Sequence, residues 1–231
     1  MQKLKGITRI AGIFLLLTGL LSSTFAQTVK ENPDLDAKVK QFLSDPANRW
    51  WDLNVPHVDG QLLYDLVIKG NYKQALEIGT STGLSGIYIA WALSKTGGKL
   101  ITIEIDEQRH KTAVENFRKA GLSEYIDARL ADAHQLVKEL KGPFDFVFSD
   151  ADKDWYKNYF LDVDPKLKVG GCYATHNISE RNPGSRGTSR GQGGNSGGMS
   201  YLEFIRSLPN YESTLDTRGG GMLISYKRAN P

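Results

Sequence analysis

Apolar residues recur along this chain with two different periods. Short continuous apolar runs are typical of buried strands, whereas apolar positions three and four residues apart are typical of helices packed on one face. The apolar runs predict strands over Ala75–Ile78, Leu100–Glu104, Tyr125–Leu130, Phe144–Ser149 and Gly171–Thr175. Helical spacing falls between them, over Gly83–Leu93, Glu107–Ala120, Ala133–Leu140 and Lys153–Leu161. Such alternation predicts a parallel sheet with helices on both faces.

The same patterns extend the domain at both ends. Helical spacing predicts helices over Asp34–Leu43 and Val58–Ile68, before the first strand, and over Met199–Leu208. Two final strands, Tyr211–Thr217 and Met222–Lys227, are joined by a glycine-rich turn. The sequence therefore predicts one α/β domain with a Rossmann-like, seven-stranded sheet. Five strands are parallel, and a terminal hairpin is inserted at one edge so that the last strand is antiparallel.

The first 26 residues differ from the rest of the chain. Three basic residues precede an apolar run over 10–21, and small residues lead up to Ala26. This order is typical of a secretory signal peptide. We therefore expect cleavage after Ala26, export to the periplasm or the exterior, and one mature domain over 27–231 without a stable membrane span. An uncleaved anchor is the alternative, although the apolar run is short for a membrane span.

Charge and cysteine content narrow the choice of partners. The chain has 29 Lys and Arg against 26 Asp and Glu, and three of the basic residues belong to the leader. The mature chain is thus electrically balanced, which gives no support to a nucleic-acid partner. Cys172 is the only cysteine, so no internal disulfide is expected.

The glycine- and serine-rich run over 182–198 predicts a flexible loop, either a plain insertion or a substrate lid.

The most specific local motif is a glycine turn after the first strand. Gly79 and Gly83 flank Thr-Ser-Thr between a predicted strand and a predicted helix. Glycine lets backbone approach a ligand closely, and a helix N-terminus offers N–H groups to an anion. Glu104 ends the next strand, 21 residues after Gly83, where nucleotide-binding folds place the acid that holds ribose hydroxyls. An adenosine-bearing cofactor is therefore expected, and these residues alone fit a nicotinamide cofactor equally well.

Polar residues also follow the other strands. Glu77, Asp132, Asp150 and the Thr-His-Asn run over 175–177 fall at or near the carboxyl ends of their strands. In an open α/β sheet, ligands bind at that edge. A single acid there is weak evidence because strand ends often carry turn-forming residues. Polar groups at five consecutive strands indicate a binding site.

Together these motifs resemble a known family. The segments that carry the resemblance are Leu76-Glu-Ile-Gly-Thr-Ser-Thr-Gly83, Ile101-Thr-Ile-Glu-Ile-Asp106, Phe144-Asp-Phe-Val-Phe-Ser-Asp-Ala-Asp-Lys153 with Tyr156, and Gly170-Gly171. They resemble class I S-adenosylmethionine-dependent O-methyltransferases, in the branch of the catechol and caffeoyl-coenzyme A enzymes. Trp51-Asp-Leu-Asn-Val55 is similar to the segment before the cofactor turn in catechol O-methyltransferase. The resemblance implies methyl transfer to a hydroxyl of a small, aromatic or catechol-like acceptor.

The resemblance also implies the cofactor residues. Glu104 would hold the ribose, Asp132 and Ala133 would lie against the adenine, and Gly79, Ser81 and Ser85 would line the methionine part. The full expected set is Val55, Glu77, Gly79, Ser81, Ser85, Glu104, Ile105, Asp132, Ala133 and Asp150. Related enzymes are often dimers, so a homodimer is one expected assembly. Because S-adenosylmethionine is made in the cytoplasm, this cofactor and the export signal are in tension.

The family chemistry further implies a divalent metal (Mg, Mn or a transition metal) that binds the acceptor, and a lysine, here Lys153, that takes its proton. The family's ligands are two Asp and one Asn. Asp150 and Asn177 match, but His176 replaces the middle Asp. His176 is then a metal ligand, a general base in a site without metal, or a hydrogen-bonded histidine with no role. Asp152 likewise replaces a family aromatic that packs on the substrate ring.

Two rival functions remain at this point. Gly79-Thr-Ser-Thr-Gly83 also fits the nucleophile elbow of α/β-hydrolases, with Ser81, Asp150 and His176 in the chain order of that family. However, the elbow would follow the first strand of the mature domain, and Glu104 and Lys153 would have no role. The second rival is an exported, non-catalytic module that keeps the fold and binds the cofactor without turnover.

Overall fold

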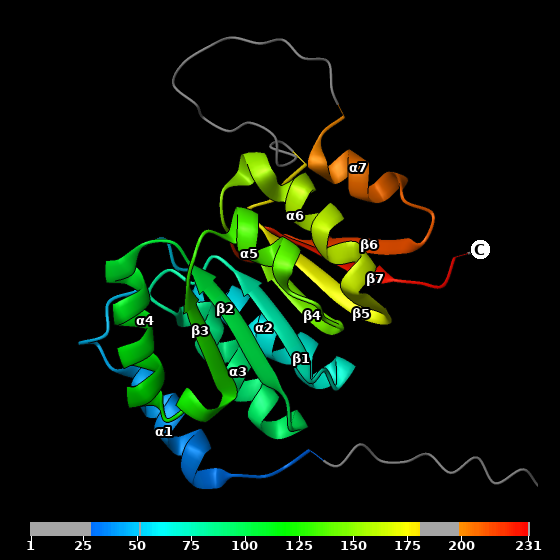
Figure 1. The fold of residues 1–231 in the computed structure, drawn as a ribbon. Coiled ribbons are helices and arrows are strands. Elements are labelled where there is room, and N and C mark those ends of the chain that lie inside the picture. Colours follow the sequence, from blue (N-terminus) through cyan, green and yellow to red (C-terminus); the bar gives the residue numbers. More distant parts are fainter. Residues whose placement is uncertain (1–28, 51, 181–198, 231) are drawn as a thin grey trace, which may run out of the picture.

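Seven strands form a single sheet in the computed structural model of this chain, which describes residues 29–50, 52–180 and 199–230. The strands are β1 Gln74–Ile78, β2 Lys99–Glu104, β3 Ile126–Leu130, β4 Phe144–Ser149, β5 Leu167–His176, β6 Tyr211–Asp216 and β7 Met222–Lys227. Their order across the sheet is β3-β2-β1-β4-β5-β7-β6 (Figure 1). The first five strands are parallel, and β7 lies antiparallel between β5 and β6. The predicted Rossmann-like sheet with an inserted terminal hairpin is confirmed.

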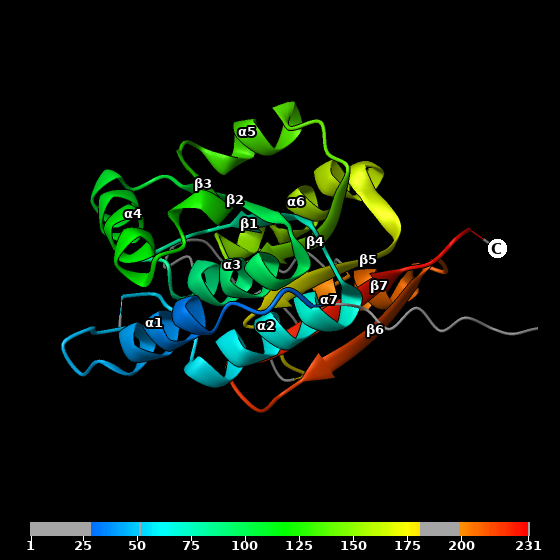
Figure 2. The same cartoon turned by 90° about the horizontal axis from the view of Figure 1, so that it is seen from below.

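Helices cover both faces of this sheet, as predicted. They are α1 Pro33–Ser44, α2 His57–Gly70, α3 Leu84–Thr96, α4 Glu107–Ala120, α5 Ala133–Glu139, α6 Tyr156–Val163 and α7 Tyr201–Ser207. Figure 2 shows α5 and α6 on one side of the sheet, with α2 and α3 on the other. Helices α1 and α4 pack on α3 through a cluster that includes Val39, Ile87 and Phe117.

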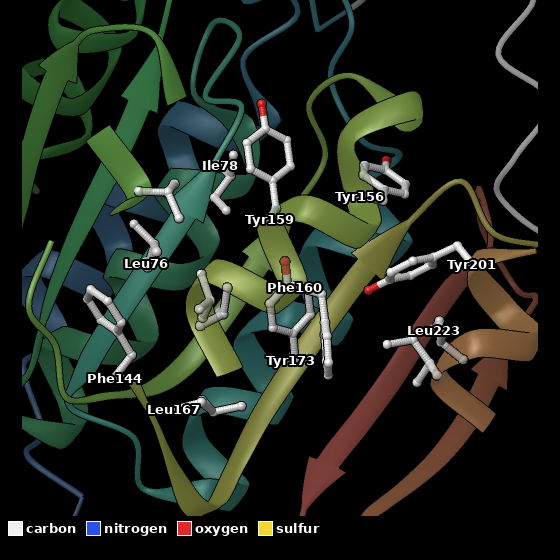
Figure 3. Close-up of a cluster of buried hydrophobic side chains, with 14 of the residues drawn as sticks. Leu76, Ile78, Phe144, Tyr156, Tyr159, Phe160, Leu167, Tyr173, Tyr201 and Leu223 are labelled. Atoms are coloured by element: carbon white, nitrogen blue, oxygen red, sulfur yellow. The ribbon is translucent and has the colours of Figure 1, made fainter. Parts of the chain in front are cut away.

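The two hydrophobic layers follow from the pleat of the strands, because successive side chains point to opposite faces. In β5, Tyr173 joins the cluster under α6 and α7, whereas Cys172 and Ala174 join the cluster under α2 and α3. Figure 3 shows the first of these clusters, in which the rings of Phe160 and Tyr173 meet edge to face at 5.1 Å. Both faces of the central strands β1 and β4, and of the second half of β5, are therefore buried, as their continuous apolar runs indicate.

Most element boundaries differ from the sequence prediction by one residue or more, and the largest differences are at the start of β5, the start of α6 and the end of α3. Strand β5 begins at Leu167 rather than Gly171, because Lys168, Val169 and Gly170 are exposed and only their backbone continues the strand. Lys153–Trp155 forms a 3-10 turn before α6, rather than the first turn of an α-helix. The turn leaves Lys153 at the carboxyl end of β4, next to the edge where the site lies.

Backbone hydrogen bonds tie the loops at the carboxyl edge together. The N–H groups of Gly79 and Thr80 both donate to the Ile103 carbonyl at 3.1 Å. The Asp150 N–H donates to the Ile78 carbonyl at 2.9 Å, and the Ala131 N–H donates to the Glu104 carbonyl at 2.9 Å. The loops after β1, β2, β3 and β4 are thereby held side by side, as the crevice of an open α/β sheet requires.

Several predictions concern other parts of the chain. The signal peptide (1–26), Trp51 and the loop over 182–198 lie outside the described residues. Within the described ranges, no helix has the length and apolar character needed to cross a membrane.

Candidate active site

A cavity of about 560 Å³ opens at the carboxyl edge of the sheet. Seven of the predicted cofactor residues line it: Gly79, Ser81, Glu104, Ile105, Asp132, Ala133 and Asp150. The other three predicted residues, Val55, Glu77 and Ser85, are buried and do not line the cavity. Strand topology therefore brings together most of a site that the sequence disperses over 72 positions, from Gly79 to Asp150.

The glycine turn is shaped by a close approach of two loops. Gly79 has a φ of +96°, and a Cβ there would lie 2.7 Å from the carbonyl oxygen of Asp150. Ser81 also lies in the left-handed region, with a φ of +50°. Because a side chain at position 79 would collide with backbone, only glycine lets the loops after β1 and β4 meet.

Glu104 is the anchor of this turn. Its Oε2 accepts the Ser81 N–H at 2.7 Å, and its Oε1 accepts the N–H groups of Ile105 and Asp106 at 3.0 Å. The residue is 7% exposed, and it lines the cavity. A carboxylate has about four acceptor positions, so Oε2 keeps capacity for a hydroxyl in the cavity.

A loop before α2 closes one side of the cavity. The Ser81 hydroxyl donates to the Asp52 carbonyl, and the Asp52 carboxylate forms a two-point ion pair with Arg109 at 3.2 Å. Asn54 donates to the Thr82 hydroxyl at 2.7 Å and accepts the Leu84 N–H. These contacts hold Leu53, which is 72% exposed, as an apolar residue at the cavity wall.

Another part of the cavity wall consists of three side chains that the sequence alone did not bring together, Asp152, His134 and Tyr159. Asp152 accepts the Tyr159 hydroxyl at 2.7 Å, and its other oxygen lies 3.0 Å from Nε2 of His134. The His134 ring stacks on Trp155, with ring centroids 4.2 Å apart. Asp152, the position where the family carries an aromatic, therefore acts here as the polar centre of an aromatic wall.

Glu77 is the most deeply buried acid of the predicted set. It is fully buried, and its Oε2 accepts the Thr102 hydroxyl at 2.5 Å, while Oε1 has no hydrogen-bond partner among the described residues. Burial raises the pKa of Glu77 to about 7, against the hydrogen bonds from Ser85 and Thr102, which lower it. Glu77 thus keeps one unpartnered acceptor oxygen behind the glycine turn, outside the cavity itself.

His176 lies between two carboxylates, one on each side of its ring. Its Nδ1 is 3.0 Å from Oδ2 of Asp150, and its Nε2 is 2.9 Å from Oδ2 of Asp59, on α2. The ring is buried. Burial lowers the pKa of His176, but the hydrogen bonds and charges of Asp150 and Asp59 outweigh burial and raise it to about 9. We call Asp59, His176 and Asp150 the clamp.

The remaining predicted residues flank the clamp. Lys153 is half-buried, and its positive charge helps to lower the pKa of Asp150, which burial raises. Asn177 follows His176, is half-buried and has a φ of +57°. Tyr156 lies against the clamp, because its hydroxyl donates to the His176 carbonyl at 3.1 Å.

A divalent metal held by Asp150, His176 and Asn177 does not fit this arrangement. A histidine coordinates a metal through a ring nitrogen with a free lone pair, and both nitrogens of His176 face carboxylate oxygens at hydrogen-bonding distance. Across the described ranges, no group of three or more His, Cys, Asp or Glu side chains is arranged to hold a metal ion.

The hydrolase interpretation also lacks its geometry. A serine nucleophile needs a hydrogen bond to its histidine. The Ser81 hydroxyl instead donates to the Asp52 carbonyl, and His176 is bonded to Asp59 and Asp150. Ser81, His176 and Asp150 therefore do not form a catalytic triad.

Comparison with known proteins now decides the family. A family model described as "O-methyltransferase" matches residues 27–180. The chain belongs to this family. It is 33% identical over 145 residues to caffeoyl-CoA O-methyltransferase 1 of Eucalyptus globulus, a match that covers 60% of this chain and 58% of the relative. It is 40% identical over 112 residues to catechol O-methyltransferase of Niastella koreensis, covering 47% of this chain and 50% of the relative. These matches span only 58% and 50% of the two relatives.

Solved structures of O-methyltransferases resemble the whole fold more fully. The O-methyltransferase from Bacillus cereus, in complex with SAH, has a TM-score of 0.65 and 25% identity, and the match covers 86% of this chain and 92% of that one. TomG from Streptomyces achromogenes, involved in tomaymycin synthesis and in complex with SAM, has the same TM-score and identity, with coverage of 87% and 92%.

Asp59 is the residue of the clamp that the sequence reasoning missed. It is 1% exposed, and it shares the buried face of α2 with Leu63, Leu66 and Val67. These positions follow Asp59 at helical spacing, so they would lie on one face of the predicted helix. A carboxylate on the apolar face of a helix is costly to bury unless it is paired. That position is the signal that would have indicated a buried partner.

Proposed function

We propose that this chain is an S-adenosylmethionine-dependent O-methyltransferase that acts on a hydroxyl of a small, aromatic or catechol-like acceptor. The observation that carries the proposal is the cavity in which Glu104, anchored by three backbone N–H groups, faces the glycine turn. A buried, acceptor-only side chain at this position suits the ribose hydroxyls of a nucleoside. Membership of the O-methyltransferase family, and structural relatives in complex with SAM or SAH, favour this cofactor over a nicotinamide.

The proposed binding roles follow the order of the cavity residues. Glu104 would hold the ribose, and Ile105, Asp132 and Ala133 would lie along the adenine. Gly79 and Ser81 would lie against the methionine part. Glu77 would lie behind the turn, near the amino group of the cofactor, and Val55 and Ser85 would support the turn from the same side.

The proposed chemistry is an in-line displacement. The bound cofactor supplies an electrophilic methyl group on a sulfonium. As the new O–CH₃ bond forms, the electron pair of the breaking C–S bond would return to sulfur, and Lys153 would accept the hydroxyl proton. The cavity walls at Leu53 and Tyr159 would hold the acceptor ring in line with the methyl group.

Methyl transfer from labelled S-adenosylmethionine to a panel of catechols, phenols and aliphatic alcohols tests the proposal. We expect transfer to an aromatic hydroxyl by the wild-type chain, and slower transfer by Glu104→Gln at a cofactor concentration that does not saturate this variant. Saturable cofactor binding without transfer to any acceptor would favour the non-catalytic module instead.

We also propose that the protein is exported, on the evidence of its first 26 residues. Cell fractionation and mass spectrometry of the mature N-terminus test this proposal. A mature chain that begins at Gln27 in the exported fraction supports it, and an intact Met1 in the cytoplasm contradicts it.

A further inference from the structure

We propose that the clamp closes the position at which the family resemblance implies a divalent cation, so that this protein binds its acceptor without metal chelation. The inference rests on the proposed function and concerns the acceptor half of the same site. Its consequence is an acceptor class: a single hydroxyl suffices, because no metal needs two neighbouring oxygens to complete its coordination.

Both nitrogens of the His176 ring are engaged by carboxylates. Nδ1 and Nε2 of His176 lie 3.0 Å and 2.9 Å from carboxylate oxygens that only accept hydrogen bonds. Each nitrogen therefore satisfies its carboxylate by presenting an N–H. An imidazole that donates from both nitrogens has no lone pair for a metal. Oδ2 of Asp150 is hydrogen-bonded to His176, so this oxygen is not available to a metal ion.

The backbone of the turn between β6 and β7 packs closely over the clamp. The Gly220 N–H donates to Oδ2 of Asp59 at 2.7 Å. A Cβ at Gly219 would lie 2.0 Å from Oδ1 of Asp59, and a Cβ at Gly220 would lie 2.6 Å from Nε2 of His176. The turn between β6 and β7 thus fits over the clamp only with glycine. This close packing indicates that the His176 ring is held in one position and is not placed to bind a metal.

Asp150 and Lys153 are the charged groups of this region that can still act on the acceptor. His176 and Asp59 are 3% and 1% exposed, so they do not face the cavity, whereas Asp150 lines it. Lys153 acts electrostatically on Asp150 from the adjoining turn. One lysine and one anchored carboxylate can orient and deprotonate one hydroxyl, without a second oxygen.

The test measures metal binding directly, without reference to activity. Mn²⁺ is titrated into the full-length wild-type chain and followed by the loss of the free-ion EPR signal, with metal analysis of the purified protein alongside. The proposal expects no bound Mn²⁺ and no metal after purification. One tightly bound equivalent in the wild-type chain would overturn it.

A variant with a rebuilt clamp tests whether the clamp is what prevents metal binding. His176→Asp combined with Asp59→Asn restores the family's two Asp and one Asn at positions 150, 176 and 177, while the side-chain carbonyl of the amide introduced at position 59 still accepts the Gly220 N–H. We expect this variant to bind Mn²⁺, and its fold is checked by circular dichroism. His176→Asn with Asp59→Asn is the matched control, because it empties the clamp without adding a carboxylate. A folded double variant with an aspartate at position 176 that binds no Mn²⁺ would contradict the role of the clamp.

A separate readout distinguishes this inference from the proposed function. If the wild-type chain binds S-adenosylmethionine and also binds Mn²⁺, only the inference fails. If it binds no S-adenosylmethionine, the proposed function fails. For any acceptor found, the analogue that keeps one hydroxyl and lacks its neighbour should remain a substrate in chelator, and strict dependence on both hydroxyls would count against the inference.

Discussion

The carboxylate of Asp59 lies 2.9 Å from Nε2 of His176, although the two residues are 117 positions apart in the sequence. This contact joins α2 to the end of β5, and the second bond of the ring, to Asp150, joins β5 to the end of β4. The clamp therefore holds three elements together directly beside the cavity.

The clamp should make stability depend on pH in a defined direction. The pKa of His176 is raised from 6.5 to about 9, so the native chain holds the imidazole proton more tightly than the unfolded chain. The resulting stability is fully present below pH 6.5 and is lost as pH rises through about 9. Urea unfolding at several pH values should show a fall of about 3 kcal/mol across this window in the wild type. His176→Gln should remove the fall, and an unchanged slope in that variant would contradict the account.

Glu77 should produce a second pH effect at lower pH. Its pKa is raised from 4.5 to about 7, so stability falls as pH rises between these values and is level above them. Glu77→Gln removes the ionisation and should stabilise the apo protein at pH 8 by up to about 3 kcal/mol. The same unfolding series checks this prediction, and a variant that is less stable than wild type at pH 8 but not at pH 5 would refute it.

The turn over the clamp should tolerate no side chain. Gly220→Ala places a Cβ 2.6 Å from Nε2 of His176 and disturbs the Gly220 hydrogen bond to Asp59. We expect a loss of about 3 kcal/mol in the free energy of unfolding. Gly97→Ala is the control, because a Cβ there meets no atom within 4 Å and only its backbone is strained, at a cost of about 1 kcal/mol. Equal losses in the two variants would show that the clash is absent.

Lys153 is expected to act on the reaction and not on cofactor binding. Lys153→Met should lower kcat by about 100- to 10,000-fold, the usual contribution of a positioned general base, with little change in the Kd for S-adenosylmethionine. Lys111→Met, on the exposed face of α4, is the matched control. If Lys153→Met is as active as this control, another group must accept the proton of the acceptor hydroxyl.

Much of this architecture could be predicted because it depends on local patterns. The strands and helices follow from apolar periodicity, and the polar residues at their ends converge because the carboxyl ends of parallel strands share one edge. The cavity thus gathers Gly79, Glu104 and Asp132 as expected.

The clamp could not be predicted in the same way. The sequence left three roles open for His176, because nothing local says that both ring nitrogens are already bonded. Its partner Asp59 belongs to α2, which precedes the glycine turn in the sequence. How deeply Asp59 is buried depends on how α2 packs on the sheet. The hydrogen bond from Gly220 likewise requires β7 to lie beside β5, which is a property of the whole sheet.

Calorimetric titration of the full-length protein with S-adenosylmethionine is the most direct test of whether the cavity binds this cofactor. We predict saturable binding of one equivalent by the wild type. Glu104→Gln should weaken it about tenfold to a hundredfold, since a hydrogen bond to a charged group contributes roughly 1.5–3 kcal/mol. Glu107→Gln, an exposed acid on α4, should bind as the wild type does. Folded wild-type protein that gives no heat of binding would contradict the assignment of this cavity to the cofactor.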